Sequence, residues 1–337
     1  MTALVRSAAL THFVEQAQAC GLDARALLDR VGLPARCLTE PDLKVAAARV
    51  GQLLEIAAVE GREPAFGLRM AESRRLSNLG PLALLVRDEP TLRRALEALV
   101  HHIHVHNEAI VIEVGAHGGL VVIRTELMSD GSGSVRQATE LVVAVTCRVL
   151  QVILGASWRP RLVCFTHSAP RSIAVHQRVL GPAVEFGHEF NGIVCNAADL
   201  DAPNPGADPV MARYSQRLLQ PALAHDASMA PRMRQLIVLL LPRGLCRVEV
   251  VAQHLGVDRR TVHRKLDAEG TSFSALLEAE RRELARRYVE DSDRPLTEVA
   301  LQLGFSAPSA FSRWHAVSIG LSAAKRRARA RAAAAGR

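Results

Sequence analysis

The chain has 337 residues, of which 49% are hydrophobic and 23% are charged. This composition excludes an intrinsically disordered chain, and the length predicts about two domains, each large enough for its own core. The formal net charge of +8 belongs to the C-terminal part: residues 230–337 hold 20 Lys and Arg against 11 Asp and Glu, a net of +9, and residues 1–229 hold 22 against 23. Such asymmetry is typical of a polyanion-binding domain joined to a near-neutral one.

The first hundred residues predict helices throughout. Apolar residues recur there at helical spacing in four segments, and Gly and Pro residues separate these segments. The predicted helices are Leu4 to Ala19, Ala24 to Val31, Lys44 to Val59 and Thr91 to Val100.

The period of the apolar pattern then changes. Ile110–Val114 and Leu120–Arg124 are rich in β-branched residues, and the glycine-rich segment Gly115–Gly119 joins them, which predicts a hairpin. Two further short runs, Arg161–Phe165 and Gly192–Cys195, predict two more strands. Helices are expected between the strands, at Ser134–Leu154 and Ser172–Leu180.

Around residue 201 the composition shifts toward Pro, Ala, Asp and Gly. Met211–Leu219 can still form a helix, whereas Gln220–Pro231 is predicted to be a flexible linker. The segment Arg232–Leu241 then predicts the first helix of a second domain. The predicted organisation is an α+β domain over residues 1–219, a linker over 220–231 and an all-α domain over 232–337.

One eight-residue pattern occurs twice in the second domain. It runs from Val251 to Asp258 and again from Val299 to Ser306, 48 residues later. In each copy an Ala four residues before a Gly allows a second helix to cross closely, and Asp258 or Ser306 can cap that helix. Each copy therefore predicts a helix-turn-helix, and the long helix Phe273–Glu290 joins the two.

The second helix of each unit would enter a DNA major groove. In the first copy Val262 and Leu266 form the inward stripe, and the second copy has Pro308 in its first turn. Because Arg can make two hydrogen bonds to guanine, the first helix is expected to read the base sequence, while the second anchors through phosphates and DNA shape. The predicted DNA-binding residues are Arg259, Arg260, Thr261, His263, Arg264 and Lys265 in the first copy, and Ser309, Ser312 and Arg313 in the second.

The same stretch resembles the DNA-binding domain of the AraC/XylS family of bacterial transcription regulators. The matching features are the R-R-T-x-x-R-K-L stretch Arg259–Leu266, the turn Gly270–Phe273, Arg281 on the joining helix, and Leu303–Phe305 before the second recognition helix. The resemblance implies double-stranded promoter DNA as a partner, a homodimer, and contact with RNA polymerase.

The end of the stretch departs from the family pattern. Such domains carry a second aromatic residue, a Trp and a Pro where this chain has His315, Ser318 and Ala323. These replacements raise the question of how the last two helices, around residues 314–323 and beyond, pack. The basic tail Lys325–Arg331 is open to two interpretations, contact with DNA phosphates or a solvated helix end.

The N-terminal domain resembles the arabinose-binding-like effector domain found in one branch of the same family, over most of residues 15–215. The resemblance implies a small-molecule effector, whose identity these turn and core positions do not tell. The matching segments are Gly67–Arg69, Leu79–Leu82, Thr91–Leu92 with Ala95–Leu96, Phe186, Phe190–Gly192 and Leu200–Pro203.

Several features predict no membrane, metal or cofactor. The apolar segment Leu141–Trp158 contains Arg148 and Gln151, which favours a core helix over a membrane span. The six cysteines lie far apart without a C-x-x-C motif, which predicts free thiols in a reducing cytoplasm. A cluster of four histidines has no Cys or Asp nearby, so a polar junction or pocket wall is favoured over a metal site. These are His101, His102, His104 and His106.

We therefore expect a cytoplasmic, non-enzymatic transcription regulator, with no catalytic residues. Its N-terminal domain would bind an effector and associate with a second copy, and its C-terminal domain would bind DNA. Two alternatives stay open: the N-terminal domain is only an oligomerisation module, or it is an enzyme fused to the DNA-binding module.

Overall fold

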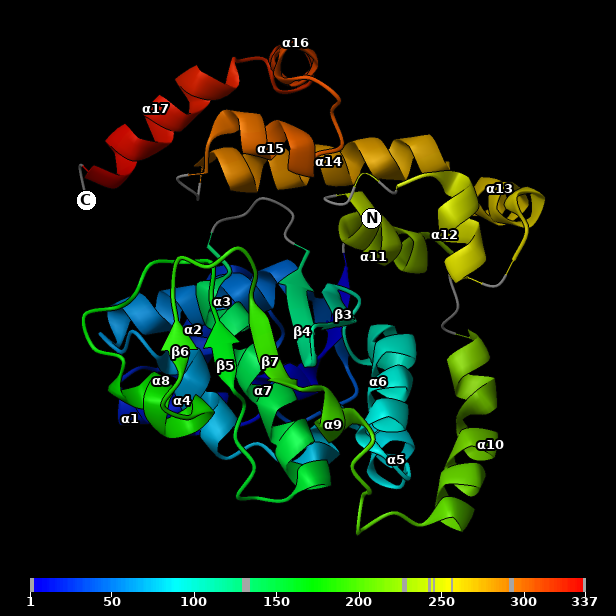
Figure 1. Cartoon of the computed structure of the whole chain (residues 1–337). Coiled ribbons are helices and arrows are strands. Elements are labelled where there is room, and N and C mark those ends of the chain that lie inside the picture. Colours follow the sequence, from blue (N-terminus) through cyan, green and yellow to red (C-terminus); the bar gives the residue numbers. More distant parts are fainter. Residues whose placement is uncertain are drawn as a thin grey trace. The chain divides into compact units, whose positions relative to one another are not determined.

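Figure 1 shows the computed structural model of the chain, which describes residues 3–128, 134–225, 229–241, 244, 246–255, 257–290 and 294–335. The chain divides into two compact units, the first closing with helix α10 (Pro209–His225) and the second opening with α11 (Met229–Leu240). The first unit combines helices with β-sheet and the second is helical. The fold class predicted from the sequence, an α+β domain followed by an all-α domain, is therefore confirmed.

The segment assigned to a flexible linker is partly helical. Residues 220–225 continue α10, and residues 229–231 belong to α11. Residues 226–228, which separate the two helices, lie outside the described residues. Ala is frequent in residues 220–231 and is the best helix former, so the composition of this segment is compatible with a helix.

The first unit begins with two short strands that the sequence did not reveal. β1 (Leu4–Arg6) and β2 (Lys44–Ala46) pair in antiparallel fashion, with Leu4 opposite Ala46. Both segments were predicted to be helical, and that prediction is wrong for them. Their hydrogen bonds join residues about forty positions apart, so no local periodicity signals the pairing.

Most of the first unit is built from short helices around an apolar core. Pro81 occupies the first turn of α5, and the left-handed Gly32 ends α2, as the breakers predict. The helical elements before the sheet are η1 (Ser7–Leu10), α1 (Phe13–Ala19), α2 (Ala24–Val31), η2 (Ala35–Leu38), α3 (Ala47–Glu60), α4 (Phe66–Glu72), η3 (Leu76–Leu79), α5 (Pro81–Arg87) and α6 (Leu92–His106).

A five-stranded sheet with the order β3-β4-β7-β5-β6 completes the unit. The predicted hairpin is confirmed, but its strands are longer and its loop is the two-residue turn Gly118–Gly119, with φ angles of 55° and 82°. The strands are β3 (Ile110–His117), β4 (Leu120–Leu127), β5 (Leu162–Cys164), β6 (Val184–Glu185), which is parallel to β5, and β7 (Gly192–Asn196). Two helices flank the later strands, α8 (Ala174–Leu180) and α9 (Ala197–Leu200).

Helix α7 (Arg136–Leu154) is the centre of this unit (Figure 1). It packs against α3, α4, α6, β4 and β7. It is long and apolar enough to cross a bilayer, but 61% of its most apolar 18-residue segment is buried inside the unit. This burial agrees with the core helix that the sequence predicts. At Gly67 of α4 a Cβ would lie 2.2 Å from the Gln137 carbonyl oxygen, so the close crossing of α4 and α7 requires glycine there.

A charged cluster is buried where α7 meets α8 and the loop after β5. The Oε1 atom of Glu140 accepts from Arg136 Nε at 2.9 Å and lies 3.1 Å and 3.2 Å from the Nε2 atoms of His167 and His176. Burial by itself raises the pKa of the Glu140 carboxyl, but the two imidazoles and the Arg136 charge together outweigh it and lower the pKa to about 2. Glu140 is fully buried, so its charge depends on these partners.

We expect Glu140→Gln to destabilise the protein by on the order of 3 kcal/mol at neutral pH, because it removes the buried carboxylate that pairs with Arg136 and lies against the His167 and His176 rings. The carboxyl has a lower pKa folded than unfolded, where 4.5 applies, so its contribution is complete above about pH 4.5 and is lost as the pH falls toward 2. Urea unfolding of both proteins from pH 7 to pH 3 should show the gap closing. Glu15→Gln, at an exposed position of α1, is the control, and a gap independent of pH would contradict the assignment.

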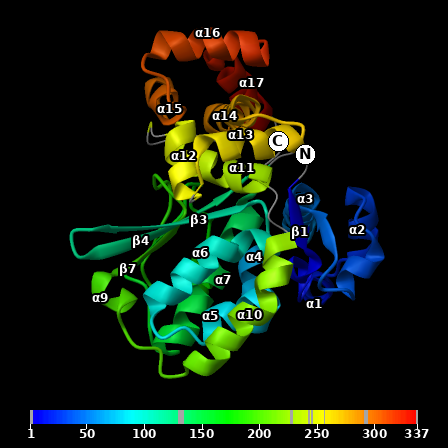
Figure 2. The same cartoon turned by 90° about the vertical axis from the view of Figure 1, so that its right-hand side faces the viewer.

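The second unit consists of helices arranged along α14 (Phe273–Glu290), whose predicted bounds are confirmed. In Figure 2, α11 and α12 lie below α14, and α16 and α17 lie above it. Phe273 and Leu276 enter one apolar core with α11 to α13, and Leu284 and Val289 enter another with α15 to α17. The remaining helices are α12 (Val248–His254), α13 (Arg259–Ala268), α15 (Leu296–Gln302), α16 (Pro308–Ile319) and α17 (Ala323–Ala335).

Candidate nucleic-acid interface and apolar cavity

Helices α12 and α13 form the first predicted helix-turn-helix. Ala252 at the helix crossing is 3% exposed, and Val262 and Leu266 are fully buried, as their spacing predicts. Asp258 caps α13: its carboxylate accepts from the Thr261 amide at 2.7 Å and from the Thr261 hydroxyl at 3.0 Å. These hydrogen bonds lower the pKa of Asp258. Gly256, assigned to the turn, lies outside the described residues.

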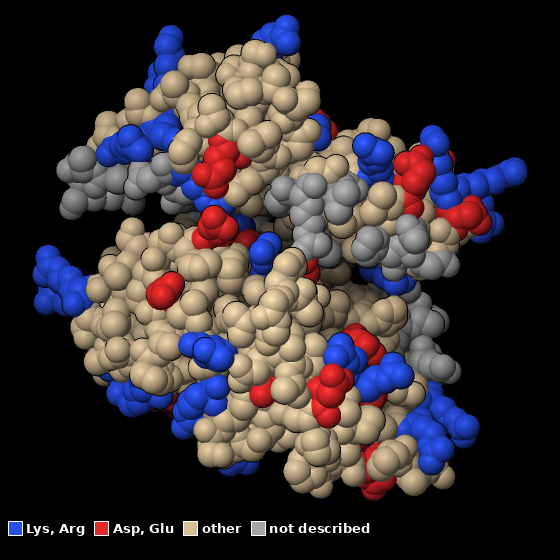
Figure 3. Space-filling model, viewed as in Figure 1, with Lys and Arg blue, Asp and Glu red and all other residues tan. Residues whose placement is uncertain are grey.

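The outward face of α13 divides into occupied and unoccupied donors. Arg259 donates to Glu249 at 3.1 Å and to His263 Nε2 at 3.4 Å, and the Thr261 hydroxyl is engaged at the cap. Arg260, Arg264 and Lys265 are exposed, and within the described residues no ion pair holds them. In Figure 3, Lys and Arg side chains project around the α13 end of the second unit, beside acidic residues.

Helices α15 and α16 form the second helix-turn-helix, around the buried Ala300, Leu303 and Phe311. The prediction that Ser306 caps its second helix is wrong, because the N-cap is Ala307, with φ −148° and ψ 142°. Pro308, at the first helical position, disfavours a helical conformation in the residue before it, so this helix begins one residue later than α13 does in the repeat.

The three predicted contact residues of α16, Ser309, Ser312 and Arg313, are all exposed. They fall on the side of α16 away from Phe311 and His315, which are buried. Two hydroxyls and one guanidinium make this a poorer set of donors than the α13 face offers.

The residues that depart from the family pattern pack at the apolar core that the end of α14 forms with α15, α16 and α17. His315 is fully buried, its ring lies edge-on to Phe311 at 5.5 Å, and its Nδ1 donates to the Leu321 carbonyl at 2.6 Å. Burial lowers the pKa of His315, which favours the neutral ring. Ser318 donates to Glu278 at 3.1 Å, and Ala323 is buried at the start of α17. A histidine thus replaces the family's second aromatic residue, and the last helices remain packed.

Polar contacts join α14 to the end of α15 and to α16. Arg281 donates from Nε to the Leu303 carbonyl at 3.1 Å, and its guanidinium lies 4.9 Å from the centre of the Phe305 ring. The Trp314 indole donates to Glu278 at 2.9 Å. These contacts fix the turn of the second helix-turn-helix against the joining helix.

The basic tail has a structural role that neither interpretation from the sequence included. Arg327 donates to the carbonyls of Tyr288 and Val289 in the last turn of α14 and to the carbonyl of Arg294, which follows this helix; Arg326 pairs with Glu290. The carbonyls at a helix end have no partners within the helix, so Arg327 caps α14. The start of the tail is therefore a packed helix and no solvated helix end.

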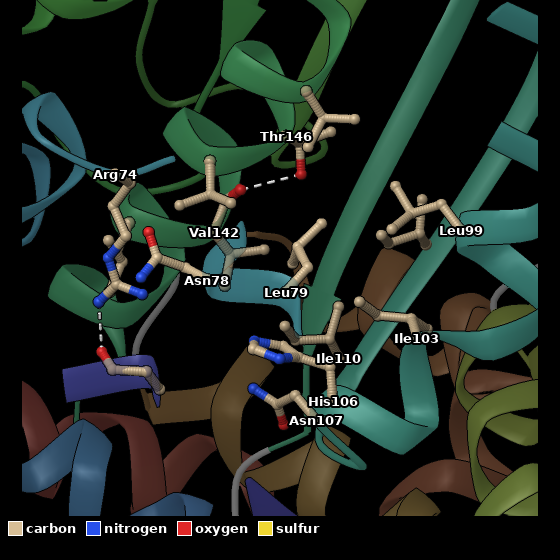
Figure 4. Close-up of a pocket in the computed structure, with 15 residues that line it drawn as sticks. Arg74, Asn78, Leu79, Leu99, Ile103, His106, Asn107, Ile110, Val142 and Thr146 are labelled. Carbon is tan, nitrogen blue, oxygen red and sulfur yellow. Dashed lines mark hydrogen bonds between the residues drawn. The ribbon is translucent and has the colours of Figure 1, made fainter. Parts of the chain in front are cut away.

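The first unit contains an apolar cavity of about 60 Å³ between α6, α7 and β3. In Figure 4, Arg74 and Asn78 lie on one side of it, Leu99 and Ile103 on the other, and His106 beside Asn107. Of the four predicted histidines, His106 is the one that lines the cavity, and its Nδ1 lies 3.3 Å from Arg6 Nη1. Burial, with the Arg6 and Arg74 charges, lowers the pKa of His106 to about 3, so the ring is neutral.

The described residues contain no group of three or more His, Cys, Asp or Glu placed to hold a metal ion. All six cysteines are free, as predicted, and burial raises the pKa of the Cys147 thiol to about 11.

Two helix-turn-helix units on one shared helix define a DNA-binding protein. Residues 21–204 match the family described as the arabinose-binding domain of AraC transcription regulators, and residues 251–329 match a helix-turn-helix domain. The HTH-type transcriptional regulator VirS of Mycobacterium tuberculosis is 31% identical over 313 residues, 92% of each chain, and the ornithine utilization regulator of Pseudomonas aeruginosa is 26% identical over 87% of each. A crystal structure of the transcriptional regulator CdpR from P. aeruginosa covers 90% of this chain and 96% of its own, at 21% identity and a TM-score of 0.44. The chain belongs to the AraC family of transcription regulators.

The unoccupied donors predict a division of labour between α13 and α16. Arg260→Ala or Arg264→Ala should relax the preference at particular bases, at a cost of about 1–3 kcal/mol per lost guanine contact. Arg313→Ala should weaken binding to all sequences alike. Arg259→Ala is the matched control and should have a smaller effect, since Glu249 already engages that guanidinium.

Selection of binding sites from a random DNA library with each variant measures these effects. The assignment is wrong if Arg313→Ala changes the selected sequence while Arg260→Ala and Arg264→Ala leave it unchanged.

Proposed function

We propose that this AraC-type DNA-binding regulator recognises specific operator sequences in the cytoplasm and is controlled by a small molecule bound in its N-terminal unit. The set of unpaired donors on α13, carried on the same α14 as α16, is the observation that supports sequence-specific binding. In this mechanism α13 and α16 enter successive major-groove segments on one face of the DNA, and contact with RNA polymerase follows from the family resemblance.

The nine predicted DNA-binding residues are proposed to have two different roles. Arg260, Arg264 and Lys265 would contact DNA directly, with Ser309, Ser312 and Arg313 from the second unit. Arg259, Thr261 and His263 would position the α13 face, because their polar atoms already have partners: Arg259 contacts Glu249 of α12 and His263, and Thr261 contacts the cap residue Asp258.

Salt should weaken DNA binding by the full-length protein steeply. Lys265 and Arg313 form no ion pair among the described residues and are not assigned to a base. They predict that log K falls with log salt concentration at a slope of about −2 per protomer, because phosphate contacts release counterions. Fluorescence anisotropy with a selected operator measures the slope, and Arg313→Ala should reduce it by about 1. A slope near zero would contradict the proposed interface.

Control by an effector is favoured over a purely associating N-terminal domain by the apolar cavity in the first unit. A fused enzyme would need titratable groups converging on that cavity, and its lining contains one neutral histidine and one arginine as the ionisable side chains. The named relatives are regulators, which also favours a non-enzymatic role.

We further propose that the protein forms a homodimer through α10. One side of this helix packs on α5, while Val210, Tyr214 and Leu218 are 51%, 58% and 75% exposed at helical spacing along the other. An apolar stripe of this kind on a surface helix is typical of an association site.

The double variant Tyr214→Asp/Leu218→Asp should convert the dimer to a monomer, because two carboxylates would be desolvated in the interface. Analytical ultracentrifugation at micromolar concentration measures the change. Val59→Asp, at a 75% exposed apolar position of α3, is the control. A double variant that stays dimeric would exclude α10 as the interface.

A further inference from the structure

The apolar cavity of the first unit shares part of its wall with an open groove. The groove has a volume of about 500 Å³ and lies along α7, between η3 and the end of that helix. Four residues line both spaces, Arg74, Leu79, Val145 and Val149. A ligand in the groove would therefore touch the same side chains that wall the cavity. The two adjoining spaces together are the candidate ligand site.

The two ends of this site differ in chemistry. Leu99, Ile103, Ile110 and Ile112 wall the inner end and offer no hydrogen bonds from their side chains. The outer end adds Arg75, Arg148 and Gln151. A molecule that matches both ends has an apolar part and a polar part, since burying hydroxyl groups against the aliphatic wall without partners costs free energy.

The polar end is positively charged. Arg74, Arg75 and Arg148 line the groove, and neither the groove nor the cavity has an Asp or Glu in its lining. Arg148 uses Nε to donate to the Arg74 carbonyl at 3.1 Å, and within the described part of the chain neither it nor Arg75 forms an ion pair. The guanidinium forks of both residues can therefore hold an anion.

Arg74 makes the need for an anion stronger. It is 5% exposed, and its guanidinium donates to the backbone carbonyls of Ala8, Ala9 and Thr11, whereas its buried Nε has no hydrogen-bond partner among the described residues. Carbonyl groups solvate this charge without neutralising it. A buried cation without a counter-ion is costly, and a bound anion nearby would offset that cost.

We propose that the ligand of the N-terminal unit is a monocarboxylate with an aliphatic tail, its tail in the groove against the side chains shared with the cavity and its carboxylate at Arg75 and Arg148. This inference rests on the proposed effector role and names the ligand's chemistry. The three arginines disfavour an amine of the same shape, and the aliphatic wall disfavours a sugar or an amino acid with a short polar side chain.

The test uses the full-length protein and three probes with the same tail: sodium octanoate, 1-octanol and octylamine. Octanoate should bind by isothermal titration calorimetry and raise the Tm, and octanol should bind at least about tenfold more weakly, because it lacks the charge-assisted hydrogen bonds to arginine. Octylamine should bind more weakly still. Octanol or octylamine binding as tightly as octanoate overturns the inference.

Variants locate the two ends. Arg75→Gln/Arg148→Gln should weaken octanoate binding about tenfold or more and leave octanol binding unchanged, which a merely structural defect would not do. Arg25→Gln/Arg171→Gln, two exposed arginines of the same unit outside the groove, is the matched control. Val145→Phe should weaken the binding of both probes, because the larger ring fills space where the groove and the cavity adjoin. Equal octanoate affinity in wild type and in the Arg75/Arg148 variant overturns the placement of the carboxylate.

The outcomes separate this inference from the effector role. If octanol or octylamine binds tightly and Val145→Phe abolishes that binding, the cavity is a ligand site and only the carboxylate is wrong. A second outcome is that none of the three probes binds and that no metabolite in a mixture raises the Tm of the wild type while leaving that of Val145→Phe unchanged. In that case the effector role is wrong, and the inference is wrong with it.

Discussion

The burial of two separate apolar clusters against one continuous helix is the constraint on which the DNA-binding unit depends. Phe273 and Leu276 near the start of α14 and Leu284 and Val289 near its end hold different sets of helices. An α-helix rises 1.5 Å per residue, so 18 residues span about 27 Å, which is comparable to the roughly 34 Å of one DNA turn. A kink in α14 would alter the spacing of α13 and α16 even if each helix-turn-helix stayed folded.

Polar contacts in the middle and at the C-terminal end of α14 supply the specificity that apolar packing alone lacks. Arg281 and Glu278 tie α14 to α15 and α16, and Arg327 of α17 satisfies carbonyls at its C-terminal end. Directional hydrogen bonds allow one arrangement of the helices, whereas apolar contacts tolerate several. The replacement of an aromatic residue by His315 is tolerated for the same reason: the ring packs on Phe311, and its Nδ1 reaches a backbone carbonyl.

In the first unit, α7 joins the core to the site proposed for the effector. One part of its surface carries Glu140 into the buried charged cluster, and another presents Val145 and Val149 to both cavity and groove. A ligand that contacts these residues would therefore act on the helix against which α3, α4, α6 and the sheet pack. Rigid packing around α7 offers a physical route by which ligand binding could alter the surface of the unit.

The sequence by itself determined the features whose physical causes are local. Helical periodicity and the following Gly32 sufficed for α2, and the i, i+4 stripe of Val262 and Leu266 oriented α13. Asp258 is a cap because a carboxylate can reach amides two or three residues ahead. The repeat at an offset of 48 residues predicts the double helix-turn-helix from sequence alone.

Only the tertiary structure decided features that join distant residues. The pairing of β1 with β2, the engagement of Arg259 by Glu249 ten positions earlier, and the capping of α14 by Arg327 leave no periodic signal in the sequence. The cavity and its arginine-lined groove likewise combine residues from β3, η3, α6 and α7. Their coincidence in space follows from chain topology and side-chain packing, which depend on all of these segments at once.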